Sequence, residues 1–140
     1  MQNTNEAIVP SEASGYDVIF VETVGVGQSE TMVKDMVDML ILIVAPGAGD
    51  ELQGIKKGIV EAADMIIVNK ADGDLKTQAV IAEMEYASAL RFVTPSYVGW
   101  TPVVKKVSSV ECKGFDEVWG SMKEFYGIVD GEGQLEKNRV

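Results

Sequence analysis

Short apolar runs alternate with amphipathic stretches along the chain, and this alternation predicts its secondary structure. Strands are predicted at residues 17–21, 39–44, 65–68 and 103–107. The run at 39–44 (MLILIV) contains no polar residue, which is typical of a strand buried on both faces of a parallel sheet. The apolar pattern therefore predicts strands separated by other elements.

The segments between these runs have apolar residues three and four positions apart, which predicts helices with one buried face. Helices are expected from Ser29, which can cap the first turn, from 50 to 63, from 75 to 90, and from Gly114 onward. The residues predicted to face inward are Met32, Val33, Met36, Val37, Leu52, Ile55, Ile59, Leu75, Ala79, Ala82, Tyr86, Leu90, Phe115, Val118, Trp119 and Met122. Strands that alternate with helices indicate right-handed βαβ units, so the predicted fold class is α/β, with three layers in which helices flank a parallel sheet.

The two ends of the chain differ from its middle. Residues 1–15 predict a partial helix, interrupted by Pro10, that leads into the domain. Residues 129–140 predict the start of a truncated C-terminal helix. Residues 16–128 carry all four predicted strands, and we expect them to form the C-terminal half of a larger domain. Sheet surface left uncovered in such a piece would promote pairing or aggregation at the sheet edge.

The composition excludes several functions. The formal net charge is −10, so no basic surface for nucleic acid or an anionic membrane is expected. The chain has no histidine, and its single cysteine, Cys112, excludes a disulfide framework. Any metal would be a hard cation on oxygen ligands, such as Mg²⁺. No apolar run reaches the roughly 20 residues that span a bilayer, and no signal peptide is evident, so we expect the bacterial cytoplasm or the mitochondrial matrix.

The polar sequence Asn69-Lys70-Ala71-Asp72 follows the third predicted strand. Ligands of open α/β sheets bind at the carboxyl ends of the strands, where these residues would lie. The Asp72 carboxylate can accept hydrogen bonds from the N1–H and 2-amino groups of guanine, and adenine offers neither donor in that arrangement. Asn69 can hold neighbouring backbone, and the stem of Lys70 can cover the face of a base. A plain polar turn explains the same residues, because Asn and Asp are common in turns.

Two further strand ends carry candidate groups. Ser108 and Ser109 follow the fourth predicted strand and are placed to offer a backbone N–H to the oxygen of the base, although serines are ordinary in a loop. After the first predicted strand, Glu22 can bind a Mg²⁺-coordinated water, and the N–H of Gly25 can reach a terminal phosphate. Gln28 can orient an attacking water, as amides do in some GTPases, but a solvated loop explains it equally well.

The chain lacks the phosphate-binding sequence G-x-x-x-x-G-K-[ST], whose backbone N–H groups and lysine hold the β- and γ-phosphates. Its nearest approach runs from Gly49 to Lys56. There the lysine comes one position late, no Ser or Thr follows it, and Asp50 and Glu51 would repel phosphate. We therefore exclude it as a phosphate loop and expect weak or no binding of GTP by this chain.

Segments 22–30 (ETVGVGQSE), 46–58 (PGAGDELQGIKKG), 69–74 (NKADGD) and 108–119 together resemble the MeaB/ArgK/methylmalonic aciduria type A family of GTPases. The resemblance implies a partial P-loop NTPase domain of the signal-recognition/MinD/BioD class. It also implies a GTP-driven metallochaperone that uses GTP or GDP with Mg²⁺. The implied partner is an adenosylcobalamin-dependent mutase of the methylmalonyl-CoA mutase type, and the intact protein would be a homodimer.

The resemblance also assigns roles to residues. The Glu22 segment would be a switch that contains Gly25 and Gln28, with Glu22 holding Mg²⁺ indirectly through water. Asn69, Lys70 and Asp72 match the guanine-specificity motif of the family, with Ser108 and Ser109 beside the base. Ser109 stands where the family usually has alanine, a small change because the contact there uses the backbone N–H. The residues that would couple nucleotide state to the mutase are Asp50, Glu51, Gln53, Lys56 and Lys57.

Other functions remain open at the level of sequence. The chain fits a non-catalytic interaction module that presents residues 50–57 to a protein partner. An older label of the family, a transport-associated ATPase or kinase, is a further alternative. A Rossmann dehydrogenase is disfavoured because no G-x-G-x-x-G opens a helix after a strand.

Overall fold

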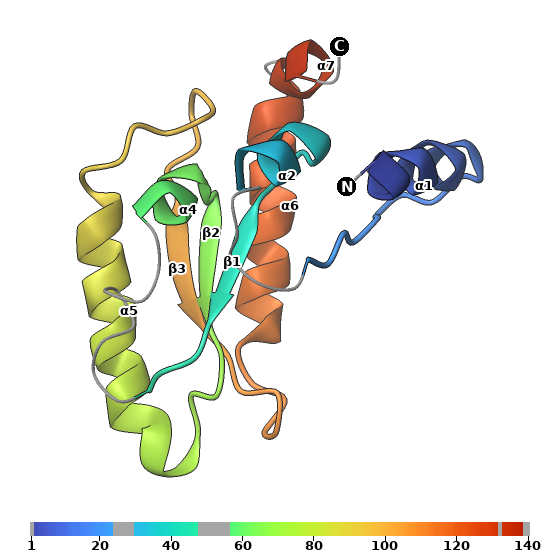
Figure 1. Cartoon of the computed structure of the whole chain (residues 1–140). Helices are drawn as coiled ribbons and strands as arrows, with labels where there is room; N and C mark the ends of the chain where they lie inside the picture. The colour runs from blue at the N-terminus through green and yellow to red at the C-terminus, as the bar shows by residue number, and fades with distance from the viewer. Residues whose placement is uncertain (1, 24–29, 48–56, 132, 139–140) are drawn as a thin grey trace.

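The computed structural model describes residues 2–23, 30–47, 57–131 and 133–138, and the fold is built around one parallel β-sheet. Its strands are β1 (Ile41–Val44), β2 (Met65–Val68) and β3 (Val103–Lys106), in the order β1-β2-β3 (Figure 1). Ile41 pairs with Met65, and Met65 in turn pairs with Val103. Because the strands are parallel and in register, their carboxyl ends lie at one edge, where ligands of open α/β proteins bind.

Helices cover both faces of the sheet. α5 (Lys76–Leu90) lies against one face and α6 (Phe115–Gly131) against the other (Figure 1). The other helical elements are α1 (Gln2–Ala13), α2 (Glu30–Met36), α4 (Lys57–Ala62), the 3-10 turn η1 (Gly73–Leu75) and α7 (Gln134–Asn138). The predicted α/β architecture, a parallel sheet between helices, is confirmed. Within the described ranges, no helix is long and apolar enough to cross a membrane.

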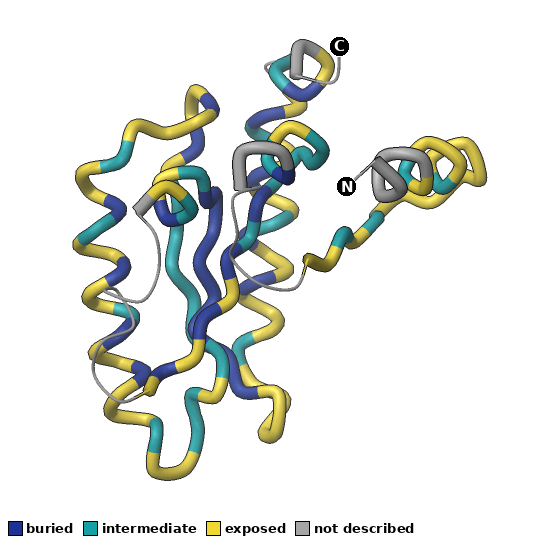
Figure 2. Tube along the Cα trace, in the orientation of Figure 1, coloured by how far each residue is buried: buried dark blue, intermediate teal, exposed yellow. Residues whose placement is uncertain are grey.

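The central strand β2 is the most deeply buried element of the sheet, as Figure 2 shows. On one face, Ile66 and Val68 pack with the buried residues of α5. These residues are Ala79, Ala82, Tyr86 and Leu90, all four of which were predicted to face inward. On the other face, Met65 and Ile67 pack with Val118 of α6. Two apolar layers therefore hold the carboxyl ends of β2 and β3 in fixed positions.

The first predicted strand, at residues 17–21, does not form, and this prediction is wrong. Phe20 is 76% exposed and Val18 is 47% exposed, and the segment lies outside any strand. A strand requires a neighbour that pairs with its backbone groups, and among the described residues β1 pairs only with β2. Figure 1 shows the segment and α1 standing apart from the sheet. An apolar run is therefore insufficient to define a strand when no edge pairs with it.

The inward face of α6 differs in part from the prediction. Val118 is buried and Met122 is partly buried as expected, but Phe115 and Trp119 are 45% and 46% exposed. The buried stripe consists of Val118, Ser121, Phe125 and Val129, which follow one another at steps of three and four. Phe115 and Trp119 lie off this stripe, so these two predictions are wrong. Of the helix predicted over 50–63, the described part is α4, which packs through Val60 and Ile59.

Candidate functional site

The loops after β2 and β3 are joined at the carboxyl edge of the sheet. The N–H of Asn69 donates to the carbonyl of Val44 at 2.8 Å, and the N–H of Val107 donates to the carbonyl of Val68 at 2.8 Å. The N–H of Ala71 then donates to the carbonyl of Val107 at 3.0 Å. These bonds extend the sheet pairing beyond the strands, so the polar residues of both loops are held side by side.

Side chains connect the same two loops. The Asn69 Oδ1 accepts hydrogen bonds from the backbone N–H of Ser109 at 3.3 Å and from its Oγ–H at 3.1 Å. The Ser108 Oγ–H donates to the Asp72 Oδ2 at 2.5 Å. Ser108 is 1% exposed, whereas Asp72 is only half-buried. The structure thus brings together two pairs of residues from loops distant in sequence, and these are the residues predicted from the sequence to bind a base.

Lys70 adopts a left-handed backbone conformation, with φ of 59°. A residue other than glycine rarely has a positive φ, and such residues concentrate at turns and functional sites. The side chain of Lys70 is exposed, so its stem is available to cover the face of a ligand. Lys70 is therefore an exposed residue with an unusual backbone conformation, directly after Asn69 and two positions before Asp72.

The predicted backbone donors are already bonded in this structure. The N–H of Ser108 donates to the carbonyl of Lys113 at 2.9 Å, and the N–H of Ser109 donates to Asn69. The second of these bonds, at 3.3 Å, is at the long end of the normal range, so it is the weaker one. A base that accepts from the Ser109 N–H would therefore compete with Asn69 alone.

The loop after β3 is closed by a contact that the sequence analysis missed. Ser108 and Lys113 form an isolated antiparallel bridge, and the Ser108 Oγ also accepts a hydrogen bond from the N–H of Glu111 at 3.0 Å. Gly114 leads into α6 with φ of +88°, and a Cβ there would lie 2.2 Å from the carbonyl oxygen of Lys106. The signal in the sequence was a glycine directly before a helix, but its close approach to β3 is a long-range feature.

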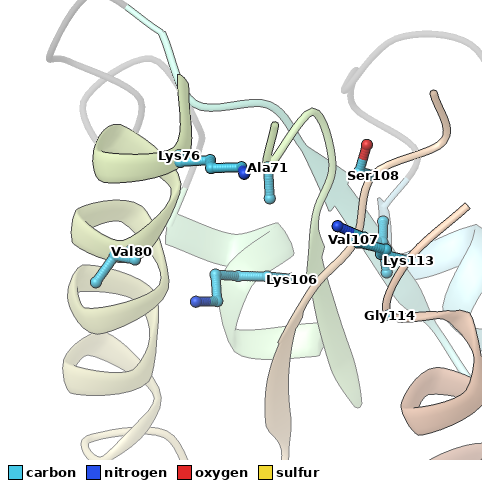
Figure 3. A pocket seen from close by; sticks show the side chains of 8 residues that line it. All are labelled: Ala71, Lys76, Val80, Lys106, Val107, Ser108, Lys113 and Gly114. Atoms are coloured by element: carbon cyan, nitrogen blue, oxygen red, sulfur yellow. The ribbon is translucent and has the colours of Figure 1, made fainter. Parts of the chain in front are cut away.

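A hollow of about 280 Å³ lies beside this loop, between β3 and α5 (Figure 3). Lys76, Lys106 and Lys113 contribute to its lining. The Lys106 ammonium group lies 3.8 Å from a carboxylate oxygen of Glu83, and that of Lys113 lies 3.3 Å from Glu111. Carboxylates therefore partly neutralise the hollow, so it is a poor substitute for a phosphate cradle.

Several predicted residues fall outside the described part of the chain. Gly25, Gln28, Asp50, Glu51, Gln53 and Lys56 lie there. Lys57 is the first residue of α4, and its side chain is not described. Glu22 is described and exposed. Across the described ranges, no three Asp, Glu or Cys side chains gather into a group that could hold a metal ion.

An open parallel sheet with polar loops at its carboxyl edge is the architecture of the α/β nucleotide-binding proteins. A family profile described as "Methylmalonyl Co-A mutase-associated GTPase MeaB" matches residues 1–140. The chain belongs to this family of P-loop GTPases.

Relatives with printed names agree with this assignment. The "Methylmalonic aciduria type A homolog, mitochondrial" of Mus musculus is 47% identical over 138 residues, which are 99% of this chain and 33% of the relative. "GTPase ArgK" of Escherichia coli is 46% identical over 138 residues, covering 99% of this chain and 42% of the relative. The crystal structure of an "LAO/AO transport system kinase" matches with a TM-score of 0.86 and 44% identity, over 99% of this chain and 44% of that one. The chain therefore spans less than half the length of these proteins.

Proposed function

We propose that the loops at the carboxyl edge of the sheet form the guanine-binding part of a GTPase that hydrolyses GTP when its phosphate-binding part is present. The observation that carries the proposal is the paired contact of Asp72 with Ser108 and of Asn69 with Ser109. It fixes a half-buried carboxylate beside a loop of backbone donors. A carboxylate acceptor beside a backbone N–H donor can distinguish guanine from adenine, because the two bases present different donors and acceptors.

Each residue would have a separate task in holding the base. Ser108 occupies one oxygen of Asp72, which leaves the other oxygen to accept from the edge of guanine. Asn69 would keep the loop after β3 in place, and the Ser109 N–H would turn to the oxygen of the base. Lys70 would cover the face of the base with its stem. These contacts support a guanine base as the ligand of the two loops. Among the described residues, no group of three or more Asp, Glu or Cys side chains could hold a metal ion.

Asp72→Asn tests the proposal through the identity of the base. Asparagine presents an N–H donor where the carboxylate accepted from the 2-amino group, so one favourable contact with guanine becomes unfavourable. We expect the free energy of GDP binding to become less favourable by about 1.5–3 kcal/mol. Xanthosine diphosphate carries a carbonyl oxygen at position 2, so the variant should prefer it over GDP. Saturation-transfer NMR with millimolar nucleotides measures both affinities.

Asp74→Asn is the matched control for this experiment. It makes the same chemical change two residues further along, at an exposed side chain in η1. The control should bind GDP and xanthosine diphosphate as the unchanged chain does. Equal preferences in the two variants would contradict the assigned role of Asp72.

We further propose, from the name of the family, that the intact protein acts as a chaperone of an adenosylcobalamin-dependent mutase. The residue range 50–57 is the segment proposed to couple nucleotide state to that partner. Two alternatives compete with this role: a non-catalytic interaction module, and the transport-associated kinase named for the structural relative. A pull-down of the mutase with GDP, with a GTP analogue and without nucleotide separates them, because only the chaperone requires nucleotide-dependent capture.

We also propose that the intact protein is a homodimer. Self-association of this chain at the uncovered edge of its sheet is a separate expectation with its own test. Ile43 is 65% exposed on β1, the strand at one end of the sheet order. An apolar edge strand promotes pairing, and a lysine on the edge prevents it. We therefore expect Ile43→Lys to lower self-association in sedimentation velocity, whereas Phe92→Lys, at an 89% exposed position outside the sheet, should not. An unchanged chain that stays monomeric at high concentration would contradict this expectation.

A further inference from the structure

A second group of polar contacts lies at the opposite edge of the sheet, where β1 and β2 begin. Asp64 directly precedes β2 and is 1% exposed. Its Oδ2 accepts a hydrogen bond from the backbone N–H of Leu40 at 2.8 Å and forms an ion pair with Lys34 in the last turn of α2. One carboxylate therefore joins α2 to the start of both strands.

Two aromatic residues before β3 complete this group. The Trp100 Nε1–H donates to the carbonyl oxygen of Asp64 at 2.9 Å. The Tyr97 hydroxyl donates to the carbonyl oxygen of Asp38 at 2.6 Å, and the Lys34 ammonium group lies 5.1 Å from the centre of the Tyr97 ring. That distance is within the range of a cation–π attraction. Lys34 is thus held by a carboxylate and by an aromatic ring.

The position of α2 depends on these contacts. The described residues of α2, Glu30–Met36, number seven, and an isolated helix of that length is unstable in water. Val33 is buried, and the side chain of Lys34 is only 17% exposed. An ion pair also requires a defined geometry, because desolvation of both charges is offset only when the partners meet closely. Lys34 and Asp64 therefore select one placement of α2 over others.

We infer that Lys34 and Asp64 are positioning residues that fix α2, the helix that begins at Glu30, in one place against the start of β1 and β2. Asp64 lies at the opposite end of β2 from the proposed base site, because Asp64 and Asn69 are five residues apart along an extended strand, a separation of about 16 Å. The anchoring of α2 rests on the contacts alone.

Distances between spin labels test the anchoring in the folded, nucleotide-free chain. One label replaces Asp35 on the exposed side of α2 and the second replaces Glu85 on α5, in a Cys112→Ser background. Double electron–electron resonance should give one narrow distance distribution for the unchanged chain. In Lys34→Met the distribution should broaden about twofold or more, because a short helix without its anchor opens locally. Lys34→Arg retains the charge and should restore a narrow distribution.

A second label pair separates loss of the anchor from general loosening. Labels at Glu85 on α5 and Glu124 on α6 span the sheet without including α2. This pair should give the same distribution in all three proteins. Broadening of both pairs, or of neither, in Lys34→Met would overturn the inference. Because no nucleotide is present, that outcome is independent of whether the base site binds guanine.

Discussion

Replacing Lys34 by methionine is expected to lower the free energy of unfolding by about 3–5 kcal/mol at neutral pH. Methionine keeps most of the length of the side chain but removes the cation, which leaves Asp64 as an unpaired charge that is 1% exposed. Urea unfolding followed by circular dichroism measures the change. Lys123→Met, at an exposed position of α6, is the matched control and should change stability by less than about 0.5 kcal/mol.

The loss in Lys34→Met should depend on pH in a defined direction. Burial raises the pKa of the Asp64 carboxyl, and the charge of Lys34 is the first influence that lowers it. Without Lys34 the pKa rises further, so the folded variant takes up a proton on Asp64 more readily than the unfolded variant does. Such a carboxyl stabilises the fold in acid and loses this contribution as pH rises through the folded pKa. The loss in free energy of unfolding caused by Lys34→Met should therefore become smaller as pH falls. A loss that is constant with pH would contradict this explanation.

Gly114→Ala is expected to lower the free energy of unfolding by about 2–4 kcal/mol. The backbone there has φ of +88°, and the new Cβ would meet the carbonyl oxygen of Lys106 at 2.2 Å and the Cα of Val107 at 3.1 Å. Backbone atoms of β3 have little freedom to move away, so the loop that carries Ser108 should shift instead. Urea unfolding measures the loss of stability.

Gly120→Ala is the matched control for Gly114. Gly120 lies within α6, and a Cβ at that position meets nothing within 4 Å. Alanine is favoured over glycine inside a helix, so the free energy of unfolding of Gly120→Ala should rise by about 0.5–1 kcal/mol. If both variants were equally stable, the close approach of Gly114 to β3 would not constrain the loop.

The sequence predicted the central layer of the fold well because its signals are local. The apolar run at Met65–Val68 and the helical spacing of Ala79, Ala82 and Tyr86 lead directly to β2 and α5. The segment at 17–21 has a similar apolar run, but none of the described strands pairs with it, and the run itself contains no information about its neighbours. Pairing is a property of two segments, so a pattern in one segment cannot establish it.

The residues of the candidate site were predictable because the signals that mark the ends of strands are local. Asn69, Asp72, Ser108 and Ser109 each follow a predicted strand, and parallel strands bring their carboxyl ends together. Their mutual hydrogen bonds, by contrast, depend on loop conformations such as the left-handed backbone of Lys70. The group around Asp64 was not predicted, because Lys34, Asp64 and Trp100 are far apart in sequence and lie at the opposite edge of the sheet.

The most direct test of the central claim is a titration of the isotope-labelled chain with guanosine monophosphate and, separately, adenosine monophosphate, followed by amide chemical shifts. If the loops after β2 and β3 bind guanine, the guanine nucleotide should shift the amides of residues 69–73 and 108–110. The adenine nucleotide should leave them in place at the same concentration. Equal shifts with both nucleotides, or shifts confined to other parts of the chain, would contradict the assignment of this edge as a guanine site.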